Sequence, residues 1–183
     1  QKVDRALYNR QIDLTMEHLA PHMRKYARLL KRIHGLDKMT FADLKIDIDP
    51  DFEPNITVEE SRKYMIEALG VLGEDYLNMV NRAYDERWID FVQNEGKSTG
   101  AFCSTPYGSH PFVLISWTDR MREVFVLAHE LGHAGHFYLA HKNQSIYNAR
   151  PSQYFIEAPS TMNEMLIANY LMKKTEDKRM KRY

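Results

Sequence analysis

The feature that most constrains this chain is the segment His129-Glu130-Leu131-Gly132-His133. It lies in a stretch, residues 119–141, whose apolar spacing predicts a helix. Two histidines four residues apart lie one above the other on a helix face. The neighbouring apolar residues require this helix to be largely buried, and buried imidazoles beside a carboxylate cost free energy unless something compensates them. A metal ion does so, and the spacing therefore predicts a zinc site with His129 and His133 as ligands.

The glutamate of this segment is predicted to be catalytic. Glu130 lies one step round the helix from His129, so its carboxylate can reach a water molecule bound to the metal. Zinc lowers the pKa of such a water to about 7, and a carboxylate can take its proton as the water attacks a carbonyl. These residue types at this spacing are what zinc-assisted hydrolysis of an amide requires.

A catalytic zinc ion normally has three protein ligands and one open position. A third histidine six residues after His133 is absent, because that position is Leu139. The downstream candidates are Glu157 and Glu164, which are seven residues apart and so share one face of the helix expected over residues 156–173. Spacing alone does not decide which of them binds the metal, and either can instead be a glutamate that faces solvent.

The composition excludes several classes of protein. Lys plus Arg and Asp plus Glu each number 25, so the net charge of +0 argues against a general nucleic-acid or anionic-membrane binder. The sequence has no uncharged apolar run of the length a transmembrane helix needs, and its first residues lack the apolar core of a signal peptide. A single cysteine, Cys103, cannot form a disulfide framework and favours a cytoplasmic location.

The remaining patterns predict a mainly α fold, α+β in detail, formed by one unit over residues 1–183. A helix is expected over residues 4–34 with a kink at Pro21 and a C-terminal cap at Gly35. Thr57 and Glu60 predict a capping box, and Thr118 or Asp119 is expected to cap the helix over residues 119–141, which we call the motif helix. The other expected elements are helices over 57–69 and 74–86 and strands over 45–48, 88–92, 99–104 and 111–117.

The two metal segments together resemble the M3 family of zinc metallopeptidases, in its oligoendopeptidase F branch. The resemblance is carried by residues 129–133, by residues 155–164, and by the shorter segments 86–90, 96–101 and 110–112. It implies a zincin-like catalytic region with a small sheet beside the motif helix, one zinc ion and short peptide substrates. It also implies that Glu157 is the third ligand, that Glu164 orients a ligand histidine, and that His136 supports the site without binding metal.

The resemblance further implies that a sheet edge beside the motif helix pairs with the backbone of the peptide substrate. The candidate residues for this edge are Gly100, Ala101, Phe102 and Cys103, because Gly100 and Ala101 leave room for another chain. An ordinary core strand is an equal alternative. Cys103 is expected to be a small buried residue rather than a nucleophile.

Members of this family are several times longer than 183 residues. Their tyrosines and histidine that hold the substrate carbonyl lie well after the zinc segments, and this sequence stops at Tyr183. We therefore expect the zinc-bearing part of a longer peptidase, which would supply the rest of the active site. The alternatives to an endopeptidase are a zinc carboxypeptidase and a non-catalytic helical domain that uses zinc for stability or for peptide binding.

Overall fold

The computed structural model describes residues 3–182. Contacts divide the described residues into two compact units. The single catalytic unit expected over residues 1–183 stays a prediction. One unit runs as far as Phe52 and includes Arg182, and the other is Glu53–Lys181. No helix among the described residues is long and apolar enough to cross a membrane.

The first unit is built on a long irregular helix. It comprises α1 (Arg5–Leu14), a π-helical turn over Thr15–Leu19, and α2 (Ala20–Ile33). The predicted interruption therefore lies in the turn before Pro21, because a proline ring clashes with the carbonyl four residues earlier and widens that turn. Gly35 adopts φ +61° beyond the last turn, and the Leu36 N–H donates to the carbonyl of Lys31 at 3.0 Å, which confirms the predicted cap.

The strand predicted over residues 45–48 is wrong. This region instead contains a 3-10 turn over Ala42–Lys45. The carboxylate of Asp43 accepts hydrogen bonds from the Thr40 N–H at 2.6 Å and from the Thr40 hydroxyl at 2.7 Å. This local closure competes with extended backbone, and no strand of the described residues pairs with the segment.

The second unit begins with two helices whose ends the sequence predicted closely. Helix α3 (Val58–Leu69) starts at the predicted capping box: the Glu60 N–H donates to the Thr57 hydroxyl at 3.2 Å, and the Thr57 N–H donates to the Glu60 carboxylate at 2.8 Å. A 3-10 turn over Gly70–Leu72 and a residue at φ +92°, Gly73, then lead into α4 (Glu74–Asp85). Both helices pack against the core of this unit.

A three-stranded sheet follows, as expected, in the order β1-β3-β2. Its strands are β1 (Ile89–Asp90), β2 (Ala101–Ser104) and β3 (Phe112–Ile115), with β1 parallel and β2 antiparallel to β3. The Ser116 N–H donates to the Gly100 carbonyl at 3.0 Å. In this register the backbone groups of Phe102 and Ser104 point toward β3, whereas those of Ala101 and Cys103 point toward the outer edge of the sheet.

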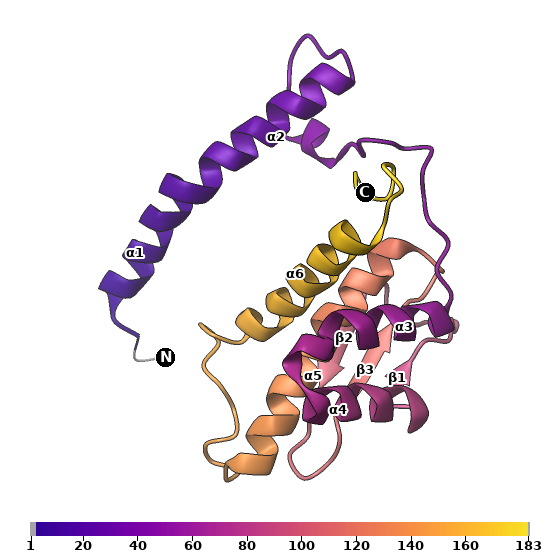
Figure 1. Cartoon of the computed structure of the whole chain (residues 1–183). Helices are drawn as coiled ribbons and strands as arrows, with labels where there is room; N and C mark the ends of the chain where they lie inside the picture. The colour runs from indigo at the N-terminus through magenta and orange to yellow at the C-terminus, as the bar shows by residue number, and fades with distance from the viewer. Residues whose placement is uncertain (1–2, 183) are drawn as a thin grey trace. The chain divides into compact units, whose positions relative to one another are not determined.

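The last two helices are the longest of this unit, and α6 (Glu157–Lys174) packs along α5 (Met121–Asn143) (Figure 1). Helix α5 starts after Arg120 rather than at Thr118 or Asp119, because the chain still turns at Asp119, where φ is +59°. Buried apolar side chains of both helices meet the sheet and α4 in one core. The predicted fold class, mainly α with a small sheet, is confirmed.

Candidate metal centre

The three predicted ligands come together where α5 meets the first turn of α6. The Nε2 atom of His129 lies 3.2 Å from Oε2 of Glu157, and the Nε2 atom of His133 lies 3.3 Å from the same oxygen. One ligand atom from each of the three residues falls within 4.8 Å of the others. Among the described residues this is the group of His, Cys, Asp and Glu side chains whose geometry suits a metal ion.

The donor set fits zinc. Donor atoms around a tetrahedral zinc ion with bonds of about 2.0–2.1 Å lie about 3.3–3.4 Å apart, close to the two separations above. Nδ1 of His129 lies 2.6 Å from Oε1 of Glu164, so this nitrogen donates its proton to that carboxylate. The Nε2 atom of a neutral His129 then directs a lone pair toward the Glu157 oxygen at 3.2 Å. Two such acceptors repel each other unless a proton or a metal cation lies between them.

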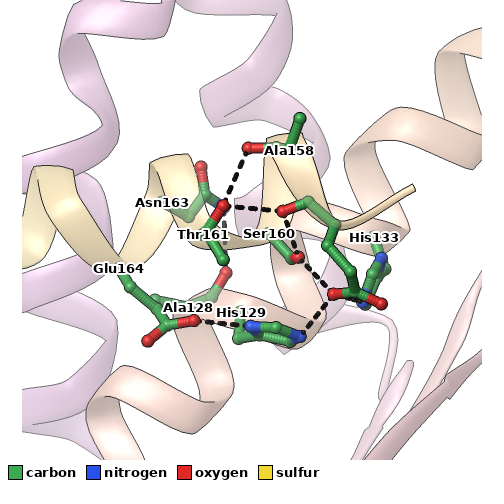
Figure 2. A network of polar contacts seen from close by, with 9 residues as sticks. Ala128, His129, His133, Ala158, Ser160, Thr161, Asn163 and Glu164 are labelled. Carbon is green, nitrogen blue, oxygen red and sulfur yellow. Dashed lines mark hydrogen bonds and ion pairs between the residues drawn. The ribbon is translucent and has the colours of Figure 1, made fainter. Parts of the chain in front are cut away.

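Glu164 therefore lies beside His129, and its role in orienting a ligand histidine stays a prediction. Glu157 is held by Ser160, a residue that the sequence patterns did not indicate. The Ser160 hydroxyl donates to Glu157 Oε2 at 2.9 Å and to the Glu157 backbone carbonyl at 2.9 Å (Figure 2). Ser160 is fully buried, whereas the Glu157 side chain is 61% exposed. The signal available in the sequence was a serine three residues after the glutamate, which on a helix makes the two side chains neighbours.

Burial sets the ionisation of the groups around the histidines. It raises the pKa of the Glu130 carboxyl, an effect that His129 and a hydrogen bond from the backbone N–H of Cys103 oppose. Burial also lowers the pKa of His133, which favours the neutral imidazole that a metal binds. Glu130 is 8% exposed and thus lies on the inner side of the site, next to strand β2.

His136 lies on α5 but does not join the three predicted ligands. Its Nδ1 atom is buried and has no hydrogen-bond partner among the described residues. The His136 ring lies edge-on to that of Phe155, with the ring centroids 6.0 Å apart. Its predicted supporting role stays a prediction.

A cavity of about 570 Å³ borders the metal ligands. Cys103 lies on its wall together with His133 and Glu157, while Phe102, whose residue is 52% exposed, does not line it. Burial raises the pKa of the Cys103 thiol to about 12, so this cysteine stays protonated near neutral pH, as expected of a residue that is no nucleophile. The other lining residues are Ser104, Thr105, Tyr107, Phe137, His141, Ile146, Ala149, Arg150 and Ile156.

Two glycines of α5 allow its neighbours to approach closely. A Cβ atom on Gly132 would lie 2.5 Å from the Cα atom of Ser160 and 2.7 Å from the carbonyl oxygen of Pro159. A Cβ atom on Gly135 would overlap Cε2 of Tyr76. No role was predicted for these glycines, although an isolated glycine inside a helical pattern is itself a signal of close packing.

Residues 4–183 match the family model for peptidase family M3. Among curated proteins, oligopeptidase PepF of Bacillus subtilis is 33% identical over 177 residues, which make up 97% of this chain and 26% of PepF. Group B oligopeptidase PepB of Streptococcus agalactiae is 32% identical over 163 residues, which make up 89% of this chain and 27% of PepB. The chain thus spans about a quarter of the length of these relatives.

Solved structures of similar fold also match this chain. A crystal structure from Chlamydophila abortus, described as that of a peptidase, has a TM-score of 0.82 and 27% sequence identity, and the match covers 98% of this chain and 30% of that one. An oligoendopeptidase F structure from Bacillus anthracis has a TM-score of 0.76 at 17% identity, with 100% of this chain and 34% of that one covered. The second likeness shows the fold alone.

Proposed function

Because this chain belongs to peptidase family M3, we propose that it is the zinc-binding catalytic part of an oligoendopeptidase that cleaves short peptides internally. The observation that carries the proposal is the meeting of His129, His133 and Glu157 beside the buried Glu130. The relatives named oligopeptidase and oligoendopeptidase F support the substrate class. Since the chain spans about a quarter of their length, the activity is proposed for this part together with the remainder of such a peptidase.

In the proposed site His129, His133 and Glu157 hold one zinc ion. Zinc, when bound, lowers the pKa of a coordinated water toward 7 and polarises the carbonyl of the scissile amide. Glu130 takes a proton from the attacking water as the new carbon–oxygen bond forms. It then passes that proton to the amine nitrogen as the carbon–nitrogen bond breaks. Its burial, which raises the pKa of the carboxyl, suits a group that must both accept and release a proton.

The proposed peptide-binding edge is β2, one of the two outer strands of the sheet in the described residues. The backbone groups of Ala101 and Cys103 point to this edge, although the Cys103 N–H is engaged by Glu130. An extended peptide can add to such an edge as a further strand. It would run past Glu130 and beside the cavity that His133 and Glu157 border. Gly100, at φ +92°, turns the chain into this strand, and Phe102 is proposed to contact the peptide through its exposed side chain.

The test combines zinc analysis with a peptide assay. The chain is purified without chelator together with the proposed remainder of the peptidase, its zinc content is measured, and quenched fluorescent peptides with blocked or free ends are offered. We expect one zinc ion per chain and cleavage of peptides whose ends are blocked. Cleavage restricted to peptides with a free carboxyl end would instead identify a carboxypeptidase. Zinc binding with no turnover of any peptide would support a structural or peptide-binding role, and a chain without zinc would overturn the proposal.

Glu164→Gln should weaken metal binding about 10- to 100-fold, as is typical when the partner of a ligand histidine is lost. The variant keeps the shape of the side chain but removes the charge that the His129 Nδ1–H faces at 2.6 Å. The measurement is the metal dissociation constant from competition with a chelator. Glu176→Gln removes the same charge outside the metal group and is the control. Equal affinities for the two variants would contradict the proposed role of Glu164.

The proposed partners are short peptides and the remainder of the longer peptidase chain. Nucleic acids and membranes are not proposed as partners, in line with the balanced count of 25 basic and 25 acidic residues. A cytoplasmic location, predicted from the single cysteine, stays a prediction.

A further inference from the structure

Two polar side chains from different helices meet at backbone carbonyl groups of α5. The Tyr76 hydroxyl, from α4, donates to the backbone carbonyl of Leu131 at 3.1 Å. The Asn163 side-chain amide, from α6, donates to the Tyr76 oxygen at 2.8 Å and to the carbonyl of Ala128 at 2.9 Å. The contact to Ala128 belongs to the polar network around His129 (Figure 2). We call Tyr76 and Asn163 the three-helix clamp, because they join α4, α5 and α6.

Because the clamp is buried, its polar groups need their hydrogen-bond partners within the protein. Asn163 is 2% exposed, and a buried amide costs free energy unless its N–H groups are paired. Its nitrogen has two acceptors, Tyr76 and Ala128. Burial also raises the pKa of the Tyr76 phenol to about 12, so the hydroxyl keeps its proton and remains a donor near neutral pH. A shift of α6 along α5 would leave these buried groups without partners.

The two glycines of α5 make the clamp possible. In an α-helix the carbonyls of residues 128 and 131 point toward residues 132 and 135. Those positions are Gly132 and Gly135, so no side chain covers either acceptor. The Tyr76 ring occupies the space of the missing side chain at Gly135, and the Ser160 backbone occupies that at Gly132. Both contacts bring α6 and α4 onto the backbone of α5.

The Asn163 contact of the clamp and the metal group are adjacent contacts between α5 and α6. Ala128, which Asn163 contacts, precedes His129, and Asn163 itself precedes Glu164, which binds the ring of His129. Glu157 contacts both histidines from the same helix α6. A slip of α6 by one residue is a movement of about 1.5 Å along its axis and would misplace both glutamates.

We propose that Tyr76 and Asn163 are positioning residues for the metal centre, which hold α6 on α5 in the one register that brings Glu157 and Glu164 to the histidines. The inference rests on the proposed metal binding. A merely structural network would change the stability of the protein and leave the metal affinity of the folded protein unchanged. A positioning network changes that affinity, because the donor atoms no longer converge.

The test uses Tyr76→Phe, which removes one hydroxyl and keeps the ring against Gly135. We expect its metal dissociation constant, measured by chelator competition at a temperature where the metal-free protein is folded, to rise about 10-fold. Tyr84→Phe is the matched control: Tyr84 lies on the same helix α4, is similarly buried, and its hydroxyl bonds Ser61 of α3 at 2.9 Å. The control should lower the melting temperature of the metal-free protein but leave the metal dissociation constant within about twofold of wild type.

A second variant, Asn163→Leu, removes both amide hydrogen bonds while keeping the number and the branching of the side-chain heavy atoms. It should also weaken metal binding about 10-fold. The double variant should bind metal with the same affinity as the weaker-binding single variant, because both changes break one network. Wild-type affinity in both single variants, with only lower melting temperatures, would overturn the clamp as a positioning device. A wild-type chain that binds no metal would instead overturn the proposed function on which the inference rests.

Discussion

Glu130→Gln should reduce peptide hydrolysis about 1,000-fold while leaving the metal affinity of the chain close to that of the wild type. Glutamine has the shape of glutamate but cannot take a proton from water, and a positioned general base typically contributes about 10²- to 10⁴-fold to the rate. Glu130 is not among the three residues whose donor atoms converge, so its replacement leaves the metal group intact. The Cys103 N–H can still donate to the remaining side-chain oxygen.

The measurement is the turnover of a blocked peptide at saturating zinc, together with the metal dissociation constant of the same preparation. Glu164→Gln is the opposite case and serves as the comparison, because it should weaken metal binding yet recover most of its turnover when zinc is saturating. The two glutamates thus separate proton transfer from ligand orientation. Turnover of Glu130→Gln within threefold of the wild type would contradict the assignment of Glu130 as the base.

Local features of the fold could be predicted because they depend on residues close together in the chain. The capping box joins Thr57 and Glu60, which are three positions apart, and the pair of His129 and His133 spans one turn of one helix. Spacing alone did not distinguish Glu157 from Glu164 as the third ligand. The structure brings Glu157 to both histidines through its Oε2 atom and places Glu164 against His129.

Other features depend on contacts that a single sequence does not reveal. Asn163 and Tyr76 are 87 residues apart, and neither the period of α6 nor that of α4 marks them as partners. The false strand over residues 45–48 had a plausible composition, but the bonds from Thr40 to Asp43 closed the backbone into a turn. In both cases hydrogen bonds of polar side chains determine the local structure, whereas the expected elements were inferred from the pattern of apolar residues.

Gly132→Ala should disable the metal centre, although alanine favours a helix by about 1 kcal/mol over glycine. The new Cβ atom would lie 2.5 Å from the Cα atom of Ser160, where ordinary contacts begin at 3.4 Å, so α6 must move by about 1 Å. The obstacle is backbone, with Pro159 O at 2.7 Å, and it cannot rotate away as a side chain can. Glu157 and Ser160 lie in the turn that must move, and the ligand set is displaced with them.

The expected result for Gly132→Ala is a loss of about 100-fold in turnover, together with weaker zinc binding, since a misplacement of about 1 Å has costs of that order. Overpacking should also lower the free energy of unfolding by about 1–3 kcal/mol, or roughly 2–4 °C in melting temperature for each kcal/mol. Gly70→Ala is the control, because its Cβ atom meets nothing closer than Leu77 Cδ1 at 3.9 Å and its φ of −55° suits alanine. If Gly132→Ala matched this control in stability and zinc affinity, close approach of α6 to α5 would not be what assembles the site.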